Sequence, residues 1–115
     1  MASLHHLALR THDVERLLAF YLRWFGLRVQ RDQRPRSVWL ALEPGSVLMI
    51  ERAELKEPMP AEGSLELIAF ALSIGERVRL REALVAASLL EGETEHTLYF
   101  RDPDGRRVAV SSYPL

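Results

Sequence analysis

The chain has 115 residues, of which 48% are hydrophobic, enough for one domain with a modest core and too many for a disordered chain. Its 15 lysines and arginines nearly balance 16 aspartates and glutamates, and a net charge of -1 gives no pull toward nucleic acid or an anionic membrane. The absence of cysteine excludes disulfides and Cys-ligated zinc, and no apolar run approaches the roughly 20 residues that span a bilayer. We therefore expect a cytoplasmic protein with no nucleic-acid or membrane partner.

The first half of the chain predicts a strand, a helix and three further strands. Leu4 to Arg10 alternates as a strand does, and Val14 to Phe25 has apolar residues at helical spacing. Asp13 is a suitable N-cap for this helix, and Gly26 is a suitable stop. Turn-forming residues then separate three strand-like runs, Leu27 to Arg31, Ser37 to Leu42 and Ser46 to Arg52.

The second half repeats this order in a shorter form. Residues 53–64 contain Pro58 and Pro60 in a polar setting and are predicted to be a linker. A strand, a helix and a closing hairpin follow, at Leu65 to Ile74, Gly75 to Leu90, Glu95 to Arg101 and Arg106 to Ser112. Only Glu91 to Thr94 remains where the first half has a full strand. The repeat predicts an α+β fold of two βαβββ-type modules, residues 1–52 and 65–115, with the second one trimmed. A ferredoxin-like sandwich leaves the extra strands between residues 27 and 52 unexplained.

Two motifs at opposite ends of the chain carry a family resemblance. The head runs His5-His6-Leu7-Ala8-Leu9-Arg10, and the tail is an Asp-Pro-Asp-Gly turn at residues 102–105, preceded by Tyr99 and Phe100. Together they resemble the vicinal oxygen chelate superfamily, which includes glyoxalase I, fosfomycin-resistance thiol transferases, extradiol dioxygenases and bleomycin-resistance proteins. The resemblance implies one glyoxalase/bleomycin-resistance-like domain over residues 1–115. It also implies a curved mixed sheet with helices on its outer face, and a homodimer.

The same resemblance implies where metal ligands stand in the metalloenzymes of the superfamily. His6 matches the first ligand, a histidine. Ala69 falls on the second histidine, Ala109 on the closing glutamate, and Met49 on a further glutamate used by glyoxalase I. Glu51 lies two residues beyond Met49 on the same strand face and is a possible substitute, which leaves His6 and Glu51 as an incomplete metal site. Because a metal site commonly needs at least three protein ligands, we expect no metal cofactor. The alternative is a divalent metal such as Zn, Ni, Fe or Mn in a rearranged site.

Strand alternation and the resemblance together predict a ligand-binding face on the sheet. Its members are His6, Met49, Glu51, Ala69, Thr97, Tyr99, Arg107 and Ala109. Such a surface is apolar with a few polar groups, which suits a small organic molecule. Trp24 and Trp39 are assigned to the core or an interface. No catalytic residue is assigned, although His6 with Glu51 or Tyr99 is a conceivable acid–base pair.

The predicted function is binding of a small, partly apolar molecule in the sheet cavity without a catalytic metal. In its missing ligands the chain resembles the bleomycin-resistance proteins more than the metalloenzymes. The alternatives are a divalent-metal-dependent lyase, thiol transferase or dioxygenase with a rearranged site, and a scaffold or regulatory subunit with a vestigial cavity.

Overall fold

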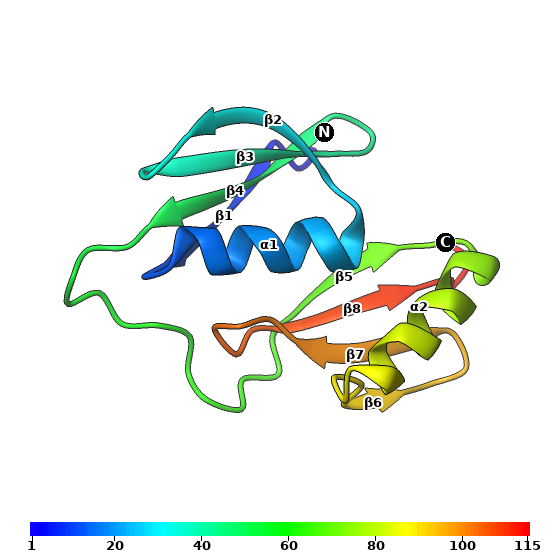
Figure 1. Cartoon of the computed structure of the whole chain (residues 1–115). Coiled ribbons are helices and arrows are strands. Elements are labelled where there is room, and N and C mark those ends of the chain that lie inside the picture. Colours follow the sequence, from blue (N-terminus) through cyan, green and yellow to red (C-terminus); the bar gives the residue numbers. More distant parts are fainter. The chain divides into compact units, whose positions relative to one another are not determined.

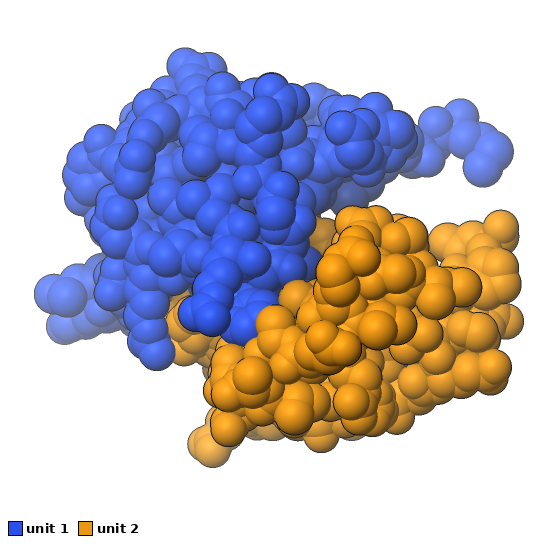
Figure 2. Space-filling model, turned by 45° about the vertical axis from the view of Figure 1, so that its right-hand side comes forward, with its two compact units in different colours: residues 1–59 blue, residues 60–115 orange.

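The computed structural model describes all residues, 1–115, and these form two compact units, Met1–Met59 and Pro60–Leu115 (Figure 2). Each unit contains one helix and one four-stranded mixed sheet (Figure 1). The predicted α+β class and the order of two βαβββ modules are confirmed. Neither helix is long and apolar enough to span a membrane.

In the first unit a helix covers one face of the sheet. The elements are β1 (His6–Thr11), α1 (Val14–Phe25), β2 (Arg28–Gln33), β3 (Ser37–Leu42) and β4 (Ser46–Arg52). The strands lie in the order β1-β4-β3-β2, with β1 parallel to β4 and the other pairs antiparallel. Helix α1 packs on β3 and β4. The core of this unit includes the fully or almost fully buried side chains of Leu17, Tyr21, Val38, Leu40, Leu48 and Ile50.

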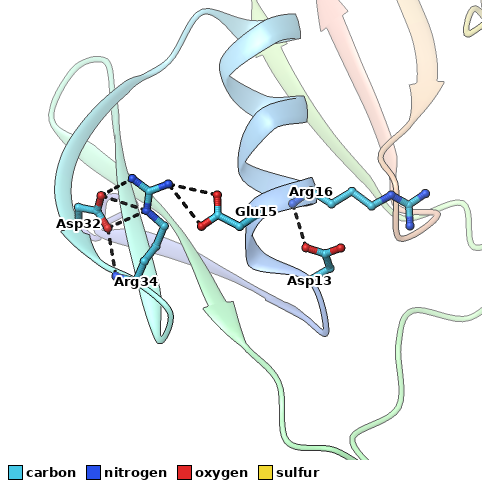
Figure 3. A network of polar contacts seen from close by, with 5 residues as sticks. All are labelled: Asp13, Glu15, Arg16, Asp32 and Arg34. Carbon is cyan, nitrogen blue, oxygen red and sulfur yellow. Dashed lines mark hydrogen bonds and ion pairs between the residues drawn. The ribbon is translucent and has the colours of Figure 1, made fainter.

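Local sequence signals define the two ends of α1. The Asp13 carboxylate accepts a hydrogen bond from the backbone N–H of Arg16 at 3.1 Å, and Gly26 ends the helix with a φ of 59°. The guanidinium of Arg34, in the β2–β3 turn, donates to the carboxylates of both Asp32 and Glu15 (Figure 3). Hydrogen bonds from Arg34 hold the pKa of Asp32 below its ordinary value. This network fastens the β2–β3 turn to the first turn of α1.

The second unit has the same order of elements with one very short strand. Its elements are β5 (Leu67–Ala71), α2 (Ile74–Ala86), β6 (Gly92–Glu93), β7 (Thr97–Arg101) and β8 (Arg107–Ser111). The strands lie in the order β5-β8-β7-β6, with β5 parallel to β8. The two residues of β6 correspond to the trimmed strand of the second module. Its buried core includes Leu84, Leu98, Phe100, Val108 and Val110.

Helix α2 is shorter than predicted and buries few of its apolar side chains. It ends at Ala86 rather than at Leu90, because Ser88 adopts a left-handed backbone with a φ of 58°. Of its apolar side chains only Leu84 is fully buried, whereas Val78 and Val85 are each about half exposed. The helix therefore contributes less to the core than its composition predicts.

The Asp-Pro-Asp-Gly motif is a structural turn between β7 and β8. The buried Asp102 carboxylate accepts hydrogen bonds from the backbone N–H groups of Asp104 at 2.9 Å and Arg106 at 3.0 Å, and from the Arg106 guanidinium at 3.2 Å. Gly105 has a φ of 86°, which a residue with a side chain rarely adopts. The motif thus fixes the register of the hairpin.

Residues 53–64, the predicted linker, contain no helix or strand, and the boundary between the two units lies within them. Glu57 attaches the first part of this segment to β1, because its carboxylate accepts two hydrogen bonds from the Arg10 guanidinium, at 2.7 and 3.0 Å. His12 Nε2 lies 2.9 Å from the Glu57 carbonyl oxygen. Residues 53–57 therefore form part of the first unit's packed structure.

Candidate functional site

The face of the first sheet opposite α1 is here called its inner face. Residues that lie directly opposite one another on neighbouring strands form three rows across it. From β2 to β1 these rows are Arg28–Ala41–Val47–His6, Arg31–Trp39–Met49–Ala8 and Gln33–Ser37–Glu51–Arg10. The predicted residues His6, Met49 and Glu51 all lie on this face. A register shift between Val29 and Arg31 places Arg28 and Arg31 on the same face although they are three residues apart.

A cavity of about 490 Å³ lies against this inner face. Its lining comprises Arg10, Gln33, Arg36, Ser37, Trp39, Met49, Glu51, Arg52, Ala53 and Glu54. Met49 and Glu51 were predicted for the site, and Trp39, which the sequence assigned to the core or an interface, lines the cavity beside Met49. The guanidinium carbon of Arg31 lies 5.0 Å from the centre of the Trp39 ring. By contrast, Trp24 is buried in the core as expected.

One wall of the cavity is held by the pair of Arg10 and Glu57, which the sequence did not indicate. Arg10 also lies 3.9 Å from the Glu51 carboxylate. Hydrogen bonds from Arg10, and then from the backbone N–H of Glu54, lower the pKa of Glu57 to about 2. The pair fastens residues 53–57, which include the cavity residues Ala53 and Glu54, to the end of β1. Its two partners are 47 residues apart, so no local pattern reveals it.

The structure does not bring His6 and Glu51 together. His6 is exposed at the first residue of β1, and its Nδ1 lies 2.9 Å from Nδ1 of His5. Glu51 lies opposite Arg10, and His6 lies opposite Val47. Glu51 and Val47 are four residues apart along β4, which corresponds to roughly 13 Å. No group of three His, Asp or Glu side chains that could hold a metal ion is present in the chain.

The second sheet has an equivalent inner face, opposite α2. From β7 to β5 its rows are Thr97–Ser111–Ala71, Tyr99–Ala109–Ala69 and Arg101–Arg107–Leu67. The five residues predicted for this half, Ala69, Thr97, Tyr99, Arg107 and Ala109, therefore share one face. The hydroxyl oxygens of Thr97 and Ser111 are 2.8 Å apart, and the guanidinium carbon of Arg107 lies 4.3 Å from the centre of the Tyr99 ring. Ala69 is exposed, whereas Ala109 is fully buried between its neighbours.

The middle row of this face is the place where the resemblance implies two metal ligands. Ala69 and Ala109 are direct register partners, so side chains at these positions lie next to each other. Their methyl groups have no donor atom, and Tyr99 completes the row. The residues present in the middle row therefore do not fit a divalent metal site, which normally takes three or more nitrogen, sulfur or oxygen ligands.

A comparison with known protein families gives a match that includes both the head motif at residues 5–10 and the turn at residues 102–105. The family model of the Glyoxalase/Bleomycin resistance protein/Dioxygenase superfamily matches residues 3–110. The chain belongs to this superfamily. Among curated protein sequences, none matches it significantly.

Solved structures of superfamily proteins resemble the chain over nearly its full length. A possible glyoxalase from Bacillus cereus is 19% identical, with a TM-score of 0.80, and the match covers 96% of this chain and 99% of that one. The fosfomycin resistance protein FosX from Listeria monocytogenes is 18% identical, with a TM-score of 0.82 and coverage of 100% and 94%. A lactoylglutathione lyase from Agrobacterium tumefaciens is 21% identical, with a TM-score of 0.72 and coverage of 96% and 93%. At these identities the likeness establishes the fold alone.

Proposed function

We propose that this superfamily member binds a small, partly apolar molecule on the inner faces of its sheets, without a catalytic metal. The observation that carries the proposal is the middle row of the second sheet, Tyr99–Ala109–Ala69. The methyl groups of Ala69 and Ala109 stand where the superfamily resemblance implies an imidazole and a carboxylate, and the Tyr99 ring lies beside them. Tyr99 and the exposed Ala69 offer carbon atoms for contact with a ligand, and neither alanine side chain can coordinate a cation.

The cavity of the first unit supports the same proposal independently. Trp39, Met49 and Ala53 are its apolar lining residues, and the other seven lining residues are polar or charged. Its volume of about 490 Å³ suits a small organic ligand, since such sites commonly measure about 300–1,000 Å³. A mixed lining of this kind suits a ligand that is neither wholly polar nor wholly apolar.

A neutral fluorescent probe, N-phenyl-1-naphthylamine, tests the binding proposal. We expect its fluorescence to rise on the wild-type protein and to rise much less on Ala69→Phe, because a phenyl ring at this exposed position covers the inner face. Ala83→Phe is the matched control, because Ala83 is an exposed residue of α2, on the opposite side of the sheet. Equal fluorescence from all three proteins would contradict binding on the inner face of the second sheet, and no rise on the wild-type protein would contradict the proposal as a whole.

The second candidate function is a divalent-metal-dependent lyase, thiol transferase or dioxygenase. His6 favours it, because it lies on an inner face with no hydrogen-bond partner on its Nε2. A structure of a FosX variant from Listeria monocytogenes, 19% identical to this chain with a TM-score of 0.78, was solved in complex with Mn(II) and a dihydroxypropylphosphonic acid. Elemental analysis of protein purified without chelators separates the two candidates. We expect less than stoichiometric zinc, nickel, iron and manganese, whereas one tightly bound metal that His6→Ala releases would establish the second.

We also propose that the protein is a homodimer. Strands β1, β2, β5 and β6 each stand at the edge of a sheet and have one hydrogen-bonded neighbour within it. Exposed edges favour pairing with another chain. Sedimentation at micromolar concentration tests this proposal, and a monomer would overturn it.

A further inference from the structure

The arginines of the inner faces differ in whether a carboxylate neutralises them. Arg10 is paired with Glu57 and Glu51, and Arg101 donates to Glu91 at 3.2 Å. Arg101 also donates to the carbonyl oxygens of Ser64 and Gly105, at 2.7 and 3.2 Å. Both guanidinium groups are therefore occupied within their own units.

Arg107 lies beside Arg101 in the same row and has no carboxylate partner. Its one protein hydrogen bond runs from Nη1 to the carbonyl oxygen of Leu65 at 3.4 Å, near the upper limit for such a bond. Like charges at directly opposite strand positions destabilise a sheet, and Arg101 and Arg107 occupy such positions. Arg107 is thus a guanidinium with most of its N–H donors free, on a face that already carries positive charge.

The Tyr99 ring holds this guanidinium in place. The separation of 4.3 Å between the Arg107 guanidinium carbon and the ring centre is a stacking distance. Arg107 is partly buried as a residue, and its guanidinium remains accessible to a ligand. Arg31 also stacks on an aromatic ring and lacks a carboxylate partner, but it is exposed and water can solvate it. Arg107 is therefore the better preorganised group for an anion.

The surface next to Arg107 is apolar. Leu67 is its register partner on β5, and Ala69 and Ala71 follow on the same face. All three are exposed, Leu67 to 41%. A ligand that engages Arg107 therefore meets carbon atoms on its β5 side.

We propose that Arg107 binds an oxyacid anion, a carboxylate or a phosphonate, at one end of a small molecule whose apolar part lies along Leu67, Ala69 and Ala71. The inference rests on the proposed function and names the chemical class of the ligand. A planar guanidinium with several free N–H donors matches the oxygens of either anion.

Three probes with the same phenylpropyl body test the inference: phenylbutyrate, phenylpropylphosphonate and the neutral phenylbutyramide. Dissociation constants are measured by NMR titration, with the Nε–H signal of Arg107 as the local readout. We expect at least one of the two acids to bind the wild-type protein roughly 10- to 100-fold more tightly than the amide, the ratio that charge-assisted hydrogen bonds typically provide. The Nε–H signal of Arg107 should shift with that acid. The relative affinities of the carboxylate and the phosphonate identify which anion the site prefers.

Variants of the protein then test whether Arg107 causes the tighter binding of the acid. Arg107→Gln should abolish the difference between acid and amide, whereas Arg79→Gln, the same change on an exposed α2 residue, should retain it. Tyr99→Phe preserves the stacking ring and should retain the preference, and Tyr99→Leu should reduce it. Circular dichroism checks that each variant is folded, and the comparison of acid with amide on the wild-type protein does not depend on any variant.

The outcomes separate this inference from the proposed function. Equal binding of acids and amide by the wild-type protein would overturn the anion site while supporting a small-molecule site. An acid preference that survives in folded Arg107→Gln would also overturn it. Absence of binding by all three probes and by N-phenyl-1-naphthylamine would overturn both proposals.

Discussion

Replacing Asp102 by alanine should destabilise the second unit more than any other single change in the β7–β8 turn. The Asp102 carboxylate is fully buried and accepts two backbone N–H groups besides the Arg106 guanidinium. The substitution removes the carboxylate that these donors share. It also removes one carboxylate from the Arg106 guanidinium, whose side chain is 13% exposed and which also contacts the Asp104 carboxylate at 3.2 Å.

The magnitude follows from these contacts. Removing one partner of a buried ion pair typically costs about 3–5 kcal/mol, because the other charge stays buried without its partner. A loss of this size is large beside a total unfolding free energy of about 5–15 kcal/mol for a natural domain. For a chain of this length we expect a fall in melting temperature of roughly 12–20 °C, taking about 4 °C for each kcal/mol.

Thermal unfolding followed by far-ultraviolet circular dichroism measures the effect, with Asp104→Ala as the matched control. The Asp104 carboxylate lies in the same turn and contacts the same guanidinium at 3.2 Å, but it accepts no backbone N–H group. We expect its loss to cost about 1 kcal/mol, the usual net value of one hydrogen bond. If Asp102→Ala lowers the melting temperature no more than Asp104→Ala does, the carboxylate does not anchor the turn in the way described.

Three further predictions concern other parts of the chain. The pKa of Glu57 is lowered to about 2 in the folded protein from an ordinary 4.5, so its contribution to stability is present above pH 4.5 and is lost as pH falls toward 2. The free energy of unfolding in urea should therefore differ less between pH 7 and pH 3 for Glu57→Gln than for wild type. An equal difference in the two proteins would contradict this. Leu84→Ala removes the one fully buried side chain of α2 and should cost about 2–5 kcal/mol in urea unfolding, and a loss below about 1 kcal/mol would mean that α2 is not anchored through it. Restoring both ligand types with Ala69→His and Ala109→Glu, which are register partners, should raise Zn²⁺ affinity above that of wild type in calorimetric titration, and no gain would show that the two positions do not converge on a cation.

Elements with local signals in the sequence were predicted well. The ends of α1 coincide with the N-cap Asp13 and with Gly26, because capping and a positive φ depend on residues within a few positions. The turn at Asp102 to Gly105 is local in the same way. Strand alternation correctly placed Met49, Tyr99 and the other predicted site residues on the faces opposite the helices.

The site features that were not predicted from the sequence depend on contacts between distant segments or on the type of residue. Trp39 alternates with the buried Val38 and Leu40, so alternation alone places it on the inner face. Its residue type favoured the core or an interface, and for that reason it was left out of the predicted ligand-binding face. The register shift after Val29 changes which β2 residues face the cavity, and no residue pattern marks it. The Arg10 contact with the linker joins segments far apart in the chain, so it could not be predicted before the fold was known.

The positions of the tryptophans give the first unit a fluorescence signal of its own. Both tryptophans of the chain, Trp24 and Trp39, belong to the first unit, whereas each unit contributes helix and strand to circular dichroism. Indole fluorescence therefore reports the melting of residues 1–59, and far-ultraviolet dichroism reports the melting of both units. Coincident transitions from the two signals would mean that the repeated modules unfold as one cooperative block. A fluorescence transition displaced from the dichroism transition would mean that each module is a cooperative unit of its own, as expected if an ancestral single module was duplicated in one chain.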